Sequence, residues 1–229
     1  PKVAVSSFTR TRLLLMHEHD ETQHALSDRT AAIYDAVASA YDAERRKDLF
    51  ELPWLRRALR DVRPGGAVLD LGCGAGEPIG AWLVGQGYAV TGADFAPAML
   101  DLYRARLPQA RVVHSDMRAL DLGARFDAII GWGSFFHLTP DEQRKALPRI
   151  AAHLAPGGRL LLTVGPGADE GIGTAGGRRV YHASLSPDEY SAILDTAQSP
   201  VEAFAPEARD AAGHSMLLAR RLMPDSVDN

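Results

Sequence analysis

The chain has 229 residues, of which 46% are hydrophobic and 24% charged, a composition that fits one globular domain with an ordinary core. Its net charge of −4 argues against broad binding to nucleic acid or to an anionic membrane, because such binding depends on clustered lysines and arginines. The single cysteine, Cys73, excludes an intramolecular disulfide, and the apolar run at residues 13–16 is too short to cross a membrane, so we expect a cytoplasmic protein.

Residues 1–26 show no regular hydrophobic period, and we expect them to form a loose N-terminal arm. The cluster His17-Glu18-His19 contains metal-ligand residue types, but no second cluster at ligand spacing accompanies it. We therefore predict a solvated segment and no metal site.

The alanine-rich stretch at residues 27–60 predicts a helical cap, with Asp28 as a plausible N-cap. Tyr-Asp occurs twice in it, with Tyr34 and Tyr41 two helical turns apart and therefore on one face. We expect these tyrosines either to form a wall of a substrate pocket or to pack in the core.

Short apolar runs then alternate with stretches of helical period, which predicts a parallel sheet covered by helices on both faces. A later helix and two weaker strands would complete a doubly wound, mostly parallel α/β sheet of seven strands with an antiparallel edge strand. We expect one domain over residues 27–222, followed by a tail. The expected strands are residues 67–72, 89–94, 111–116, 126–132, 158–164, 201–206 and 214–221, and the expected helices are residues 78–87, 96–107, 140–158 and 186–197.

Acidic residues end the first three expected strands: Asp70, Asp94 and Asp116. Ligands of such folds bind at the carboxyl ends of the strands. These three carboxylates therefore indicate where a ligand site would lie.

The first strand leads into the loop "GCGAGE", in which Gly72, Gly74 and Gly76 alternate. Glycine at such a turn also serves ordinary packing and positive φ angles. The spacing matches neither the P-loop nor the dinucleotide pattern G-x-G-x-x-G that a nicotinamide dehydrogenase would need. Glu77 follows, and its charge would oppose a pyrophosphate at the start of the next helix. The loop predicts bare backbone that meets a ligand carrying positive charge.

The segments "VLDLGCGAGEPIGAWLVGQGYAVTGADFAPAML", "VVHSDMRAL", "FDAIIGWGSFFHL" and "LAPGGRLLLTV" resemble class I S-adenosylmethionine-dependent methyltransferases, particularly the small-molecule branch. The resemblance covers about residues 65–165, in the same order along the chain. It implies a Rossmann-like fold, S-adenosyl-L-methionine as the cofactor and S-adenosyl-L-homocysteine as the product.

The resemblance also implies roles for the residues at the strand ends. Asp70 would orient the amine of the cofactor or, alternatively, cap the next helix. Asp94 would accept hydrogen bonds from both ribose hydroxyls, as an ionised carboxylate can. The main chain that would hold the methionine end is that of Gly72, Cys73, Gly74 and Gly76.

The adenine and the sulfonium would be held further along the chain. The resemblance places Phe95 on one face of adenine and Asp116 with Met117 at its edge. Gly131 and Trp132 would line the floor beneath the sulfonium, although Trp132 could instead belong to the core. Cys73 lies inside the glycine loop and is a poor candidate for a nucleophile.

We expect the residues that act on the methyl acceptor to lie after the fourth strand and in a later segment. His137 is the best candidate for a general base, or else it packs beneath the next helix. The glycine-rich stretch at residues 165–177 predicts a flexible part of a lid or substrate segment over residues 166–190. Tyr181 and His182 follow it, and as strand neighbours only one of them should point into the pocket.

The sequence thus predicts a methyltransferase that acts on an oxygen or nitrogen atom of a small molecule, without DNA, membrane or metal. A base is dispensable if the acceptor is an amine that arrives neutral. The alternatives are a non-catalytic cofactor-binding or partner subunit and an enzyme that acts on protein or RNA, of which RNA is disfavoured by the lack of a basic stripe. The sequence identifies neither the acceptor nor the oligomeric state.

Overall fold

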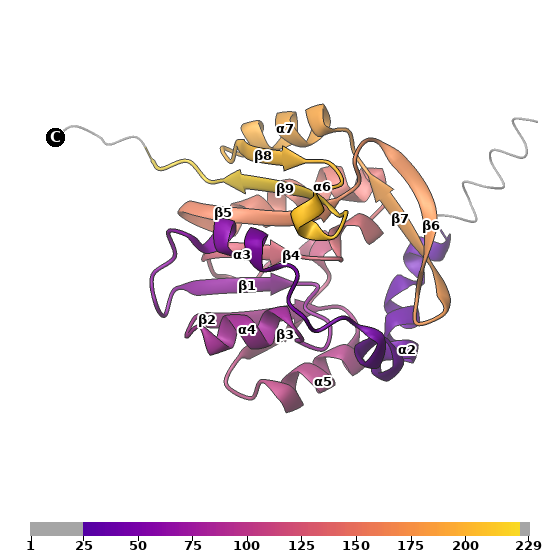
Figure 1. Ribbon diagram of the computed structural model, residues 1–229. Helices are drawn as coiled ribbons and strands as arrows, with labels where there is room; N and C mark the ends of the chain where they lie inside the picture. The colour runs from indigo at the N-terminus through magenta and orange to yellow at the C-terminus, as the bar shows by residue number, and fades with distance from the viewer. Residues whose placement is uncertain (1–24, 225–229) are drawn as a thin grey trace, which may run out of the picture.

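The computed structural model describes residues 25–224, and a seven-stranded sheet in the order β3-β2-β1-β4-β5-β9-β8 forms its centre (Figure 1). Strands β1 to β5 are parallel to one another, whereas β9 is antiparallel to both of its neighbours. The predicted mostly parallel sheet is confirmed, with the antiparallel strand one place inside the β8 edge. The strands are β1 (Ala67–Leu71), β2 (Ala89–Asp94), β3 (Arg111–His114), β4 (Phe126–Gly131), β5 (Leu154–Val164), β8 (Val201–Ala205) and β9 (Ser215–Arg220).

Helices cover both faces of this sheet, which explains why its strands are apolar at nearly every position. In β5, Leu160 and Leu162 belong to the core beneath α6 and α7, while Leu161 belongs to the core beneath α3 and α4. The helices are α2 (Thr30–Glu44), α3 (Leu52–Leu59), α4 (Ile79–Gly85), α5 (Pro97–Arg106), α6 (Pro140–Ala152) and α7 (Pro187–Thr196).

Two predicted element boundaries are wrong. Residues 25–28 are already helical and Arg29 precedes α2, so Asp28 is not an N-cap; its carboxylate lies 4.0 Å from Arg118. The helix predicted to reach residue 158 ends at Ala152, because Leu154 already pairs with Phe126 as the first residue of β5. Apart from residues 25 and 26, the predicted loose arm lies outside the described residues, as do His17, Glu18 and His19.

The glycine-rich stretch expected to be flexible instead contributes to a β-hairpin. Strands β6 (Asp169–Ala175) and β7 (Arg178–Ser184) pair with each other in a separate two-stranded sheet. Gly176 and Gly177 form the turn with positive φ angles of 51° and 72°. The hairpin lies beside α2 at the carboxyl-end side of the main sheet (Figure 1).

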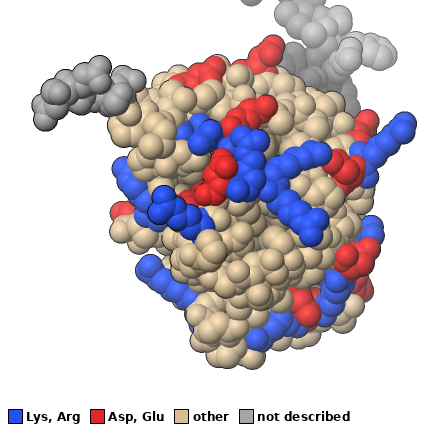
Figure 2. All heavy atoms as spheres, turned by 60° about the vertical axis from the view of Figure 1, so that its left-hand side comes forward, with Lys and Arg blue, Asp and Glu red and all other residues tan. Residues whose placement is uncertain are grey.

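The opposite edge, where the parallel strands begin, carries charges of both signs (Figure 2). The guanidinium of Arg159, which is 1% exposed, lies 2.7 Å from carboxylate oxygens of Asp61 and Glu202. On this face, positive and negative side chains lie beside one another and form no single-sign patch. Within residues 25–224, no helix combines the length and the apolar character needed to cross a membrane.

Candidate active site

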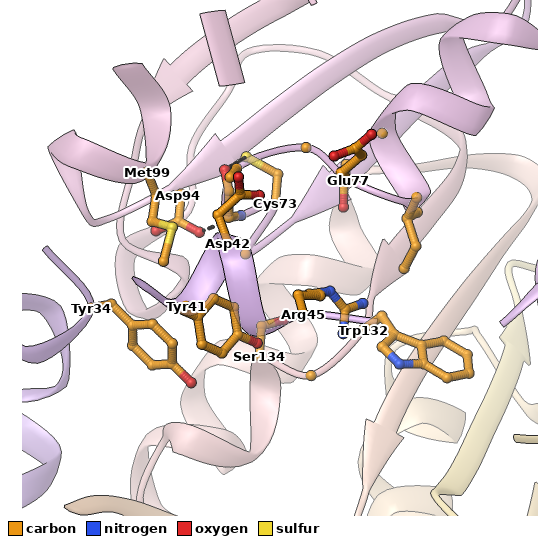
Figure 3. Close-up of a pocket in the computed structure, with 18 of the residues that line it drawn as sticks. Tyr34, Tyr41, Asp42, Arg45, Cys73, Glu77, Asp94, Met99, Trp132 and Ser134 are labelled. Atoms are coloured by element: carbon orange, nitrogen blue, oxygen red, sulfur yellow. Dashed lines mark hydrogen bonds between the residues drawn. The ribbon is translucent and has the colours of Figure 1, made fainter. Parts of the chain in front are cut away.

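A cavity of about 710 Å³, open to solvent, lies at the carboxyl ends of β1, β2 and β4 beneath α2 (Figure 3). A second hollow of about 490 Å³ adjoins it, and the two share Gly72, Asp94, Phe95, Ser134 and His137 as lining residues. Most of the predicted site residues line one or both of them. Those residues are Tyr34, Tyr41, Asp70, Gly72, Cys73, Gly74, Gly76, Asp94, Phe95, Asp116, Met117, Trp132 and His137.

Three predicted residues do not line either space: Gly131, Tyr181 and His182. A Cβ atom on Gly131 would overlap the side chain of Leu162, so this glycine serves packing within the sheet. Strand β7, which carries Tyr181 and His182, contacts the lining residue His137 through the backbone oxygen of Tyr181 and the ring of His182.

The three loop glycines meet different surroundings. A Cβ atom on Gly72 would collide with Ser134, and one on Gly76 would lie 2.9 Å from the ring of Tyr103. Gly74, with a φ of 52°, has only the sulfur of Met99 within 4.0 Å of such an atom. Of the three glycines, Gly74 is thus the one that leaves backbone free for a ligand. Gly72 and Gly76 instead make room for side chains of the protein itself, those of Ser134 and Tyr103.

Sequence analysis missed Tyr103, whose ring is fully buried. Besides Gly76, the ring packs where Gly80 and Gly92 lack side chains: a Cβ atom on Gly92 would lie 2.7 Å from its Cζ. The hydroxyl of Tyr103 has no hydrogen-bond partner among the described residues. The signal in the sequence was Gly92, because a glycine inside an apolar strand such as β2 often marks the close approach of another group.

Asp94 connects the glycine loop to the start of α5. Its carboxylate accepts one hydrogen bond from the backbone N–H of Gly74 and one from that of Ala96, both at 2.9 Å. Burial raises the pKa of this carboxyl, and the backbone N–H groups oppose that rise. A carboxylate has more acceptor sites than these two bonds use. Asp94 therefore retains capacity for hydroxyl donors in the cavity.

Asp70, one strand away, has no comparable support. Its side chain is buried, and Oδ2 has no hydrogen-bond partner among the described residues. Burial, together with the negative charge of Asp94, raises the pKa of Asp70 to about 7. A buried carboxylate without a partner is costly, and a cation in the cavity would relieve that cost.

The acids at the cavity mouth are paired within the protein. Glu77 lies 2.8 Å from Lys47 and 3.5 Å from Arg106, and Asp42 lies 2.7 Å from Arg106. The free negative charge that the sequence suggested at Glu77 is thus already balanced. Burial raises the pKa of the Cys73 thiol well above its ordinary value, which disfavours the nucleophilic thiolate.

Arg45, immediately after α2, is a second residue that sequence analysis missed. Its guanidinium reaches the cavity between Tyr41 and Trp132 (Figure 3). Nη2 donates a hydrogen bond of 2.8 Å to Oε1 of Glu51, whose side chain is fully buried. Nothing in the charged run at residues 44–48 distinguishes this arginine, because its position depends on where the chain turns after α2.

His137 has both ring nitrogens engaged. Nδ1 lies 2.9 Å from the backbone oxygen of Tyr181, which can only accept, so Nδ1 carries the hydrogen. Nε2 is then the acceptor for the hydroxyl of Tyr34, also at 2.9 Å. Burial lowers the pKa of His137 to about 4, so the ring is neutral near pH 7.

The other two candidates for acceptor chemistry pack away from the cavity. Tyr181 is fully buried, and its hydroxyl donates a hydrogen bond to Glu170. The ring of His182 packs against those of Phe136 and His137, with centroids 4.6 and 5.0 Å apart. The expectation that one of the two neighbours enters the pocket is not met, since neither residue lines it and β7 reaches the site only through the backbone oxygen of Tyr181 on His137.

The aromatic residues predicted for the cofactor lie at the walls. Trp132 lines the cavity and also packs against Phe50 and His214, with centroids 5.9 and 5.8 Å away. It therefore combines the wall position and the core position that the sequence left open.

In the adjoining hollow, the carboxylate of Asp116 already accepts hydrogen bonds of 2.9 and 2.8 Å from the backbone N–H and Nε of Arg118.

The described residues contain no group of three or more His, Cys, Asp or Glu side chains that could hold a metal ion. The site they form consists of a glycine turn, two strand-end carboxylates, one arginine and an aromatic wall.

Comparisons with known proteins agree with this architecture. Residues 68–158 match the family model described as "Methyltransferase domain". The chain is 31% identical over 144 residues to a dTDP-4-amino-2,3,4,6-tetradeoxy-D-glucose N,N-dimethyltransferase of Saccharopolyspora spinosa, covering 62% of this chain and 57% of that protein. It is 33% identical over 114 residues to a probable tRNA methyltransferase 9B of Mus musculus, covering 49% and 24%. The chain thus spans less than two thirds of the length of these relatives.

Solved structures share the fold. An amino pentose methyltransferase from Micromonospora echinaspora superposes with a TM-score of 0.61 at 24% identity, covering 82% of this chain and 96% of that one. The glycopeptide N-methyltransferase MtfA superposes with a TM-score of 0.60 at 23% identity, covering 78% and 91%. Residues 68–158 thus match a methyltransferase-domain model, and the chain shares its fold with these methyltransferases.

Proposed function

We propose that the protein is an S-adenosylmethionine-dependent methyltransferase that methylates an amine nitrogen of a small molecule. The observation that carries the proposal is the open glycine Gly74 between two buried strand-end carboxylates, of which Asp70 has an oxygen without a partner. These residues fit the cofactor, since it combines an ammonium, a ribose diol and a flat base. When bound, it supplies a methyl group on a positively charged sulfur.

Each part of the cofactor has a counterpart in the cavity. Asp94 would accept hydrogen bonds from the ribose hydroxyls, and Asp70 would pair with the ammonium. Phe95 and Met117 line the adjoining hollow, which suits the adenine. Asp116 would contribute there mainly through its backbone, because its carboxylate is held by Arg118.

The surroundings of His137 favour a nitrogen acceptor over a hydroxyl. Its basicity is low because burial lowers its pKa to about 4, and its Nε2 lone pair already accepts the hydrogen of Tyr34. Such a ring is poorly suited to removing a proton from a hydroxyl, whereas a neutral amine needs only to be held in line with the methyl group. We infer that His137 positions the Tyr34 hydroxyl against the acceptor.

Relatives support this choice, since proteins from two organisms are N,N-dimethyltransferases of dTDP-linked amino sugars. The first test is a calorimetric titration of the purified chain with S-adenosylhomocysteine, with Asp94→Ala as the control. We expect binding by the wild type and markedly weaker binding by the variant.

The second test is turnover of labelled S-adenosylmethionine against matched acceptors: nucleotide-linked amino sugars, the corresponding hydroxyl sugars and tRNA. We expect methylation of an amine. Tight cofactor binding with no turnover on any acceptor would favour the non-catalytic alternative, and turnover on tRNA alone would favour the activity named for the tRNA methyltransferase relatives.

A further inference from the structure

The side chain of Gln143, on α6, joins the chain just after His137 to the hairpin and to α7. It is fully buried, and its Nε2 donates hydrogen bonds of 2.9 Å to the backbone oxygens of Leu138 and Ala183. Its Oε1 accepts a hydrogen bond of 2.6 Å from the hydroxyl of Tyr190. Because backbone oxygens only accept, these contacts also fix which end of the amide carries the nitrogen.

Both backbone oxygens that Gln143 binds are close in sequence to the contacts of His137. Leu138 follows His137 directly, and Ala183 lies two residues after Tyr181, whose backbone oxygen lies 2.9 Å from Nδ1. Backbone oxygens two residues apart on a strand point to the same edge of that strand. Gln143 and His137 therefore bind the same edge of β7, and the amide holds that edge in reach of the imidazole.

A second contact from α7 fixes the end of β7. The hydroxyl of Tyr190 accepts a hydrogen bond of 3.1 Å from the backbone N–H of Leu185 and lies 3.1 Å from Oγ of Ser184. A buried network in which each polar group has a partner favours one arrangement over others. The position of the Tyr181 carbonyl is thus held from α6 and α7 as well as by the pairing of the hairpin.

The bond at Nδ1 decides the direction of the bond on the other side of the ring. Since Nδ1 carries the hydrogen, Nε2 offers a lone pair, and the hydroxyl of Tyr34 donates to it. A hydroxyl has one hydrogen, so the oxygen of Tyr34 can then only accept from any other group. Tyr34 lines the cavity, where it therefore presents an acceptor (Figure 3).

This direction matters when the methyl acceptor is an amine. Its nitrogen lone pair forms the new bond to the methyl carbon, the carbon–sulfur bond breaks with its electrons on sulfur, and the resulting ammonium releases a proton to water. A hydroxyl hydrogen aimed at the amine would occupy that lone pair. An oxygen that only accepts binds an N–H of the amine and leaves the lone pair free for in-line attack.

We propose that Gln143 is a positioning residue that keeps the hydrogen of His137 on Nδ1, so that the oxygen of Tyr34 accepts an N–H of the acceptor amine. The inference rests on the proposed function and narrows its substrate class. The acceptor is then a primary or secondary amine, because it must bring an N–H of its own.

Nitrogen-15 NMR of the protein with labelled histidine tests the first step, because it distinguishes a ring nitrogen that carries hydrogen from one that does not. The variant His137→Gln removes the signals of this residue and so assigns them. At pH 8 we expect the hydrogen on Nδ1 in the wild type. In Gln143→Met, which keeps the length of the side chain but has no N–H groups, a substantial share should move to Nε2.

Initial rates with a dTDP-linked amino sugar as the acceptor test the second step. In Gln143→Met, kcat/KM for the amine should fall about tenfold, a factor typical of one hydrogen bond. The calorimetric affinity for S-adenosylhomocysteine should not change, because Gln143 lines neither space.

Arg159→Met is the matched control, since it also removes buried hydrogen bonds but does so at the opposite edge of the sheet. It should lower stability without changing the tautomer of His137 or kcat/KM. If Gln143→Met fails to fold because the Tyr190 hydroxyl is left buried and unpaired, Gln143→Met/Tyr190→Phe removes that hydroxyl and permits the same comparison.

The outcomes separate this proposal from the proposed function. A hydrogen on Nε2 in the wild type, or an unchanged tautomer or kcat/KM in the Gln143 variant, would overturn the role of Gln143. An equal fall of kcat/KM in Arg159→Met would also overturn it, because the effect would then follow stability. Failure of the wild type to methylate any amine would overturn the proposed function, while the NMR comparison would still decide whether Gln143 sets the tautomer.

Discussion

The hydroxyl of Tyr34 on α2 lies 2.9 Å from Nε2 of His137, which follows β4. The same imidazole bonds through Nδ1 to the backbone oxygen of Tyr181 on β7. One neutral ring thus joins the cap helix, the main sheet and the hairpin at the edge of the cavity.

This relationship predicts a mild effect of His137→Ala on chemistry. With an amine acceptor at saturating S-adenosylmethionine, kcat should stay within about tenfold of the wild type, because a loss of proton transfer would cost about a hundredfold or more. The KM for the acceptor should rise, and Tyr34→Phe should act in the same direction. Initial rates measure both quantities. A fall in kcat of several orders of magnitude would instead show that His137 acts as a base.

The buried ring also predicts a pH dependence of stability. The folded-state pKa of His137 is about 4, against an ordinary value of 6.5, so between these values the unfolded chain binds the proton first. The free energy of unfolding should therefore fall as the pH falls from 6.5 to 4, by up to roughly 3 kcal/mol from this residue.

Urea unfolding of the wild type and of His137→Gln at several pH values measures that contribution. Burial also lowers the pKa of His182 and of His214, and both histidines remain in the variant. The difference between the two proteins therefore isolates His137. Identical slopes between pH 4 and 6.5 would contradict the assignment.

We expect the Asp70 carboxyl to lower the stability of the ligand-free protein and to strengthen cofactor binding. Its pKa is raised from 3.8 to about 7, so the folded chain holds its proton more strongly and loses stability as the pH rises through this range. Asp70→Asn should raise the free energy of unfolding of the ligand-free protein at pH 8, by about 2 kcal/mol or more. The same variant should bind S-adenosylhomocysteine less tightly. Urea unfolding and calorimetry measure the two effects, and an unchanged or lower stability would refute the expected cost of the buried charge.

The packing of Tyr103 predicts a strong coupling to Gly92. A Cβ atom on Gly92 would lie 2.7 Å from the ring, so Gly92→Ala should destabilise the protein by about 1–3 kcal/mol. The double variant Gly92→Ala/Tyr103→Leu should lose less unfolding free energy than the two single variants lose together. Urea unfolding of the wild type, the two single variants and the double variant measures these losses. Gly85→Ala is the control, because no atom lies within 4 Å of its added Cβ and it should be close to neutral. Additive costs would show that the two residues do not interact.

The sheet was predictable because its strands are buried on both faces and therefore read as continuous apolar runs. Asp70 and Asp94 were predictable for a related reason, since strand ends in this fold meet at one edge. The ends of α6 and β5 were not, because the chain leaves the helix where pairing with Phe126 becomes available, and that partner lies far away in the sequence.

The residues that sequence analysis missed depend on tertiary contacts. Tyr103 sits on an ordinary helix and acquires its role from a glycine in a different strand. Arg45 stands in a charged run and differs from Arg46 only in the direction that the chain takes after α2. The hairpin was mistaken for a flexible loop because Gly171 and Gly173 are poor strand formers, and their pairing with β7 decides the structure.

The hairpin fixes the hydrogen bonding of His137 without taking part in the pairing of the main sheet. Its strands pair only with each other among the described residues, yet its main chain at residue 181 sets the tautomer of His137. A main-chain carbonyl is present whatever amino acid occupies that position. A substitution at residue 181 therefore leaves this hydrogen bond to the imidazole in place, and the main sheet keeps its own pairing.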